Sequence, residues 1–240
     1  MRMDYEQRSK AWVDNHYRDS EARGGVGWAH IPDKMEQGAD RLERLVQEYG
    51  PRGGRMLEIG CGAGDISLLL APRGLFDEIH GVDISETAIT WANRKAAKSG
   101  LAVQFHVGNM VDLRDFADAS FDAIIAFACL HWVIGYDRQD CLANVCRVLK
   151  PGGRFYAWTS GRSTDVIQPS EPTGESYFEP KSGLLIRNGL PYFHLKLPQE
   201  VLAEIRNAGL NGLHWELDER EEDDGPYFSG ALIVVAAKPC

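Results

Sequence analysis

From residue 55 onward the chain alternates short apolar runs with amphipathic segments. Runs rich in β-branched and aromatic residues predict strands at 55–59, 78–82, 103–107, 121–127 and 153–159. Apolar positions three or four apart predict helices at 65–71, 85–98 and 138–149. The run 121–127 is almost wholly apolar, which is typical of a central strand buried on both faces. The alternation as a whole indicates an α/β domain with a parallel sheet covered by helices.

Both ends of the chain depart from this alternation. Residues 4–18 and 34–49 predict two helices, and we expect residues 1–50 to form an N-terminal helical segment that covers an active site in a domain of residues 51–240. Residues 161–195 carry prolines and glycines without a sustained period, which predicts an irregular, lid-like insertion over the substrate. After a helix at 198–208, the runs 213–217 and 231–237 predict an antiparallel hairpin at the sheet edge.

Composition excludes several classes of protein. Net charge is −9, of which the run 216–224 supplies −6. This acidic run predicts a solvated turn. Lysines and arginines are scattered along the rest of the chain, so the sequence shows no basic stripe that could bind a nucleic-acid backbone. Five cysteines without a CxxC pair indicate neither a disulfide framework nor a metal site. The longest apolar run has eight residues and the N-terminus lacks an apolar signal region, so we expect a cytoplasmic protein without a membrane partner.

The strongest chemical signal is a glycine loop, Leu57-Glu58-Ile59-Gly60-Cys61-Gly62-Ala63-Gly64, at a predicted strand-to-helix junction. Glycines let a backbone approach a ligand closely, and a helix N-terminus favours polar or anionic groups. The spacing is GxGxG, with Asp65 where a dinucleotide motif has its third glycine. Asp65 would repel a pyrophosphate, which disfavours NAD and FAD, and Glu58 indicates a ligand with a cationic group.

Asp83 ends the second predicted strand, 19 residues after Gly64. From that position a carboxylate accepts both hydroxyls of a ribose, although Asp83 also fits a helix-start stretch in which Ser85 is the N-cap. The glycine loop nearby favours the ribose interpretation.

With four motifs besides the glycine loop, residues 55–160 resemble the class I S-adenosylmethionine-dependent methyltransferases. The motifs that carry the resemblance, besides the glycine loop, are Gly81-Val82-Asp83-Ile84-Ser85, Gly108-Asn109-Met110, Phe121-Asp122-Ala123-Ile124-Ile125 leading to Leu130-His131-Trp132, and Arg147-Val148-Leu149-Lys150-Pro151-Gly152-Gly153. The resemblance implies S-adenosylmethionine as cofactor. It also implies a Rossmann-like seven-stranded sheet of order 3-2-1-4-5-7-6, with strand 7 antiparallel and helices on both faces.

The same resemblance implies a role for each cofactor-binding residue. The implied set is Glu58, Gly60, Cys61 and Gly62 around the methionine part, Asp83 on the ribose, Ile84 on the adenine, Asn109 and Met110 at the adenine edge, and Ala126 and Phe127 beside the reactive methyl group. Asn109 stands where the family usually has Asp, and its amide oxygen can accept the same hydrogen bond.

Acid–base chemistry has one candidate, His131, at the end of a predicted strand. A sulfonium methyl is already electrophilic, so an in-line nucleophile needs mainly positioning, and a base is required only when that nucleophile arrives protonated. His131 is then either a general base or, together with Trp132, a wall of the pocket.

The methyl acceptor must be recognised outside the shared core. The candidates are mainly aromatic residues of the N-terminal segment and the insertion. The predicted substrate-binding set is Tyr17, Trp28, His131, Trp132, Tyr177 and Tyr192. Each of the aromatic residues could instead pack beneath a loop. We expect a small organic acceptor with an O, N or S nucleophile, and a monomer or homodimer. A protein or RNA methyltransferase and a non-catalytic cofactor-binding scaffold stay open as alternatives, and a nicotinamide-dependent reductase is the weakest.

Overall fold

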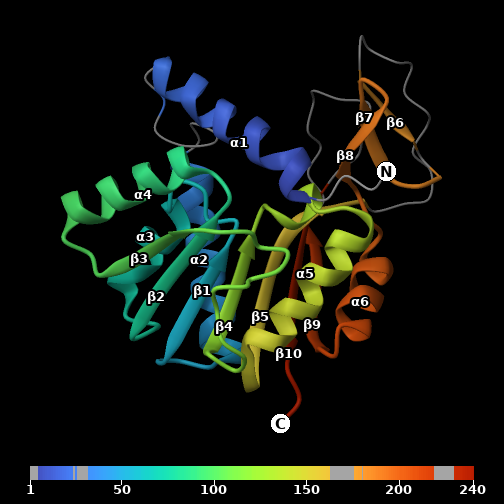
Figure 1. Ribbon diagram of the computed structural model, residues 1–240. Coiled ribbons are helices and arrows are strands. Elements are labelled where there is room, and N and C mark those ends of the chain that lie inside the picture. Colours follow the sequence, from blue (N-terminus) through green and yellow to red (C-terminus); the bar gives the residue numbers. More distant parts are fainter. Residues whose placement is uncertain (1–4, 24, 26–31, 163–175, 180, 219–229) are drawn as a thin grey trace.

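The computed structural model describes residues 5–23, 25, 32–162, 176–179, 181–218 and 230–240 (Figure 1). A seven-stranded sheet forms its centre, in the order β3-β2-β1-β4-β5-β10-β9. Its strands are β1 (Arg55–Ile59), β2 (Glu78–Asp83), β3 (Val103–Val107), β4 (Phe121–Phe127), β5 (Leu149–Gly161), β9 (Asn211–Asp218) and β10 (Gly230–Ala237). Strands β1 to β5 are parallel, and β10 runs antiparallel to both of its neighbours. The predicted strand order, its one antiparallel strand and the edge hairpin are confirmed.

Helices cover both faces of the sheet (Figure 1). They are α1 (Tyr5–Ala22), α2 (Pro32–Tyr49), α3 (Asp65–Leu70), α4 (Glu86–Ser99), α5 (Gly135–Val148) and α6 (Pro198–Asn207), with short 3-10 turns η1 (Ala71–Arg73) and η2 (Leu130–Trp132). Helices α5 and α6 pack on one face, and α2, α3 and α4 on the other. In β10 this places Leu232 and Val234 in one core and Ile233 and Val235 in the other, because successive strand residues point to opposite faces.

The helix before β5 differs from its predicted bounds at both ends. Helix α5 begins at Gly135, three residues earlier than predicted, and its last residue is Val148. Leu149 takes an extended conformation and pairs with Phe121 at the start of β4, so β5 already includes Pro151 and its two glycines. Pro151 therefore lies inside a strand rather than marking a separate stop between helix and strand.

Part of the predicted irregular insertion is an ordered antiparallel sheet, so the expectation of an irregular segment is wrong for residues 176–179 and 181–194. Its strands are β6 (Ser176–Glu179), β7 (Leu184–Arg187) and β8 (Leu190–His194). Asn188 and Gly189 join β7 to β8, and both have positive φ values, 52° and 74°. An Asn-Gly pair is the preferred two-residue turn between hairpin strands, so the sequence carried this signal. Residues 163–175 and the acidic run from residue 219 lie outside the described residues.

Helix α1 crosses above the carboxyl ends of the sheet strands, from the small sheet toward α4 (Figure 1). Its Asp14 carboxylate accepts hydrogen bonds from Ser85 Oγ (2.8 Å) and from the Thr87 backbone N–H (3.0 Å) at the start of α4. Ser85 Oγ in turn accepts from the Ala88 N–H at 3.1 Å, which confirms Ser85 as the N-cap. None of the helices that the structure describes combines the length and apolarity needed to cross a bilayer.

Candidate active site

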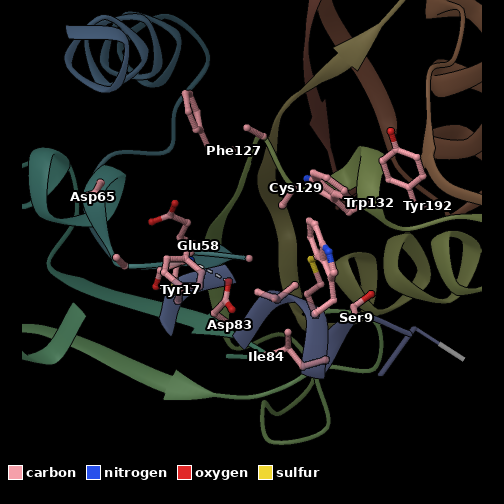
Figure 2. Close-up of a pocket in the computed structure, with 18 of the residues that line it drawn as sticks. Ser9, Tyr17, Glu58, Asp65, Asp83, Ile84, Phe127, Cys129, Trp132 and Tyr192 are labelled. Carbon is pink, nitrogen blue, oxygen red and sulfur yellow. Dashed lines mark hydrogen bonds between the residues drawn. The ribbon is translucent and has the colours of Figure 1, made fainter. Parts of the chain in front are cut away.

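A cavity of about 470 Å³ opens at the carboxyl ends of β1, β2 and β4, beneath α1 and the small sheet (Figure 2). Carboxyl ends of parallel strands are where open α/β sheets bind ligands. Its described lining residues are Ser9, Trp12, Val13, Tyr17, Met35, Glu58, Gly60, Cys61, Gly62, Ala63, Asp65, Ile66, Asp83, Ile84, Met110, Phe127, Ala128, Cys129, Trp132, Arg187, Asn188, Leu190, Pro191 and Tyr192.

The glycine loop forms the floor of the cavity, and none of its three glycines leaves room for a side chain. Gly60 and Gly62 have φ values of +63° and +53°, a region that other residues rarely adopt. A Cβ on Gly60 would lie 2.6 Å from the Cys129 Cβ, and one on Gly62 would lie 2.3 Å from the Tyr17 hydroxyl oxygen. The two glycines therefore let Cys129 and Tyr17 pack directly on the loop backbone, which lines the cavity.

The Asp83 carboxylate ties this loop to the start of α4. One oxygen accepts the Gly62 N–H and the other the Ser85 N–H, both at 2.9 Å. Asp83 is 8% exposed, and this burial raises the pKa of its carboxyl group, while the backbone N–H groups of Ser85, Gly62 and Ile84 act in the opposite direction. A carboxylate has about four lone-pair sites, so Asp83 keeps some capacity to accept a hydrogen bond from a ligand in the cavity that it lines.

Glu58, at the end of β1, is the second buried carboxyl group of the floor. It accepts hydrogen bonds from Ser67 Oγ (2.5 Å) and from the Ser67 N–H (3.0 Å) in α3. Burial raises the pKa of Glu58 to about 8, against the opposing effect of both Ser67 hydrogen bonds. A cationic ligand group placed beside Glu58 would favour the ionised form and lower this pKa again.

Tyr17 lies at the same end of the cavity as the two carboxyl groups (Figure 2). Its ring meets Trp91 of α4 edge-on, with centroids 5.8 Å apart, and its hydroxyl lies against Gly62. Burial, followed by the charge of Asp83, raises the pKa of the Tyr17 hydroxyl well above its ordinary value. Tyr17 therefore closes the glycine loop from above as a neutral side chain.

The opposite end of the cavity is aromatic. The Trp132 ring lies 5.1 Å from Trp12 of α1 and 6.0 Å from Tyr192 of β8, measured between ring centroids. Figure 2 shows Trp132 and Tyr192 on the side of the cavity away from Glu58 and Asp83, with Phe127 above Glu58. Carboxyl groups and aromatic rings thus face each other across one space.

His131 is buried beside the cavity rather than in its lining. Its Nδ1 accepts the Ser160 backbone N–H at 3.2 Å, which assigns the ring hydrogen of the neutral side chain to Nε2. The ring packs on Phe193, with centroids 4.3 Å apart. Burial, with the nearby Arg138 charge as the second cause, lowers the pKa of His131 to about 3. Nδ1, the nitrogen that could take a proton from an acceptor, already accepts a hydrogen bond from the backbone.

The structure brings most of the predicted site residues to this one cavity. Those that line it are Glu58, Gly60, Cys61, Gly62, Asp83, Ile84, Met110, Phe127, Tyr17, Trp132 and Tyr192. The predicted residues that do not line it are Asn109, Ala126, His131 and Tyr177. The side-chain oxygen of Asn109 instead accepts the Val111 N–H at 2.9 Å. Trp28 lies outside the described residues. Among the described residues no cluster of His, Cys, Asp or Glu is arranged to hold a metal ion.

Several lining residues are absent from the predicted set. Ser9, Val13 and Met35 carry no chemical signal in the sequence, since they reach the cavity only through the way α1 and α2 fold over the sheet. Cys129 lies two residues after the end of β4, and its Sγ lies 3.2 Å from the Ile59 carbonyl oxygen. Arg187 and Asn188 reach the cavity through the β7–β8 turn, and the Asn-Gly turn signal marks that position.

Comparison with known proteins gives consistent matches. Residues 57–157 match the family model described as a methyltransferase domain. The ubiquinone biosynthesis O-methyltransferase of Xylella fastidiosa is 28% identical over 208 residues, covering 83% of this chain and 81% of that protein.

Two solved structures match over nearly the whole chain. The (4+2)-cyclase SpnF superposes with a TM-score of 0.72 at 21% identity, over 99% of this chain and 97% of that one. The second is the 1,6-didemethyltoxoflavin-N1-methyltransferase of Burkholderia thailandensis, solved with 1,6-didemethyltoxoflavin and S-adenosylhomocysteine. It superposes with a TM-score of 0.71 at 17% identity, over 100% of this chain and 92% of that one. At these identities the likeness shows the fold.

Proposed function

Because the chain carries, at residues 57–157, a methyltransferase domain of the class I S-adenosylmethionine-dependent family, we propose that it methylates a small organic acceptor. S-adenosylmethionine is the cofactor, and an O, N or S atom of the acceptor displaces its methyl group in line. One observation carries the proposal: a single cavity joins a glycine floor with buried carboxyl groups to an aromatic end.

The residues at the carboxyl end fit this cofactor. Asp83 has a buried carboxylate with lone pairs left for the two ribose hydroxyls, and Ile84 lines the cavity beside it for the adenine ring. Glu58 faces the same space and fits the ammonium group of the methionine part. Gly60, Cys61 and Gly62 line the cavity between these groups, where the methionine chain would lie.

Bound S-adenosylmethionine supplies an electrophilic sulfonium methyl group, so the protein has to orient an acceptor and exclude water. Trp12, Trp132 and Tyr192 provide an apolar surface for the acceptor at the far end of the cavity. Positioning of this kind contributes ~7–11 kcal/mol in well-oriented systems. The Nδ1 hydrogen bond and the lowered pKa of His131 favour a supporting role, in which His131 holds Phe193 and the neighbouring Trp132 in place.

The similarity to SpnF favours one second candidate, because a cyclase on this fold shows that the fold can host other chemistry. A chain that binds the cofactor and rearranges its substrate without methylating it would share the whole carboxyl end of the cavity. Methyl transfer itself is therefore the property that separates the two functions.

Incubation with methyl-labelled S-adenosylmethionine and a panel of small phenols, carboxylates, amines and thiols tests the proposal. We expect labelled product and S-adenosylhomocysteine in equal amounts with at least one acceptor class. Label transferred to protein or RNA instead would favour a macromolecular methyltransferase. Calorimetric binding of S-adenosylhomocysteine without transfer to any acceptor would favour the cyclase or a scaffold.

A further inference from the structure

Arg187 gives the aromatic end of the cavity a charge that methyl transfer itself does not require. It ends β7 and is the one lysine or arginine among the described residues that line the cavity. Its guanidinium carbon lies 4.6 Å from the centre of the Tyr192 ring, and its Nε donates to Ser176 Oγ at 3.2 Å. These two contacts hold the guanidinium at the edge of the aromatic surface.

The remaining donors of this guanidinium are available to a ligand. Within the described part of the chain, the two terminal nitrogens of Arg187 make no hydrogen bond or ion pair. A guanidinium is planar and always charged, and its N–H groups match the two oxygens of a carboxylate. The cavity edge therefore has the geometry to bind a carboxylate rather than a neutral group.

Charge at the other end of the cavity strengthens this preference. Asp83 lines the cavity on the side away from Tyr192, and so does Asp65, whose charge is balanced by an ion pair with Lys95 Nζ at 2.5 Å (Figure 2). An anionic acceptor is repelled from that side and attracted to Arg187, so the charges of the cavity fix the direction in which it enters.

The surface between these charges suits a flat ring. Trp12, Trp132 and Tyr192 come from α1, η2 and β8, and neighbouring rings are tilted by 39° and 41°. Aromatic side chains bind planar aromatic ligands by offset stacking and edge contacts, in addition to burying apolar area.

We infer that the methyl acceptor is a planar aromatic carboxylate, with its ring against Trp12, Trp132 and Tyr192 and its carboxylate on Arg187. The inference deepens the proposed function and rests on it, since it names the acceptor class for the same cavity.

The test measures calorimetric dissociation constants of 2-naphthoate and of 2-naphthamide, a neutral molecule of the same shape, for the protein saturated with S-adenosylhomocysteine. We expect naphthoate to bind about tenfold more tightly, the effect of a charged hydrogen-bonded pair reduced by partial exposure. Arg187→Gln should abolish the preference and leave naphthamide binding unchanged. Arg206→Gln, on the exposed side of α6, is the matched control and should keep the full preference.

Trp12→Leu supplies a second arm, because it should weaken both ligands by the same factor. Equal binding of the two ligands to the parent, a preference that survives Arg187→Gln, or binding of neither ligand overturns the inference. If S-adenosylhomocysteine itself gives no heat with the parent, the proposed function fails instead. The naphthoate and naphthamide titrations are then repeated without it, and they still decide whether Arg187 makes the cavity prefer a carboxylate.

Discussion

Replacing Asp83 perturbs the cofactor end of the cavity most directly. Its carboxylate accepts the Gly62 and Ser85 N–H groups at 2.9 Å, so Asp83→Ala leaves two buried donors without their acceptor. Hydrogen bonds to a charged group contribute ~1.5–3 kcal/mol each, and water entering from the cavity recovers part of this loss. We therefore expect a loss of about 2–4 kcal/mol in the free energy of unfolding.

Asp83→Ala should also weaken cofactor binding in the protein that stays folded, by more than the lower free energy of unfolding would cause. Two hydrogen bonds from the ribose hydroxyls to the carboxylate, at the lower value of ~1.5 kcal/mol each, correspond to about a hundredfold increase in dissociation constant. Calorimetry with S-adenosylhomocysteine measures this increase on protein that circular dichroism shows to be folded. Asp83→Asn, which keeps one acceptor oxygen, should give an intermediate loss and serves if the alanine variant unfolds.

Asp77→Ala is the matched control. Like Asp83, Asp77 accepts a glycine N–H, that of Gly54 at 2.7 Å. Asp77 precedes β2, whereas Asp83 is its last residue, and Asp77 does not line the cavity. It should lower stability but leave the dissociation constant of S-adenosylhomocysteine within about twofold of the parent value. If folded Asp83→Ala binds S-adenosylhomocysteine as tightly as the parent, the ribose assignment is refuted.

Four further outcomes are expected. Because burial raises the pKa of Glu58 from 4.5 to about 8, the folded state holds an extra proton in that window. Stability should therefore fall as pH rises from 5 to 8, and Glu58→Gln should flatten this slope in urea titrations. His131→Gln should raise KM while leaving the pH profile of kcat unchanged near pH 6.5, and a lost ionisation there would restore His131 as a base. Glu204→Ala should cost about 3 kcal/mol in urea unfolding, because it removes the carboxylate 2.7 Å from Arg138, which is 1% exposed; an unchanged midpoint would contradict this. Amide exchange in β6, β7 and β8 should slow when S-adenosylhomocysteine and naphthoate are both bound, and full protection in the free protein would argue against a lid.

Features decided by local chemistry were predictable from the sequence. The bounds of β1, β3 and β4 match the predicted strands, because each is a short apolar run between turn residues. The Ser85 cap follows from the preference of a hydroxyl for a helix start. The strand order came from the ordered motifs of a family, since periodicity alone does not say which strands pair.

Features decided by long-range packing were not predictable. Tyr17 stays a predicted substrate-binding residue, but nothing local shows that α1 would place its hydroxyl on Gly62, 45 residues further along the chain. His131 lies in η2, four residues after the end of β4, and nothing local shows that the Ser160 N–H would donate to its Nδ1. The small sheet has strands of four or five residues, too short for a two-residue period to stand out among prolines and glycines.

A crystal structure of the protein with S-adenosylhomocysteine tests the central claim, that the cavity holds the cofactor at its carboxyl end and opens its sulfur toward the aromatic end. We predict both ribose hydroxyls within hydrogen-bond distance of the Asp83 carboxylate, with the sulfur facing Phe127 and Trp132. An adenosine bound away from Asp83, or a sulfur facing away from the aromatic rings, would contradict the claim.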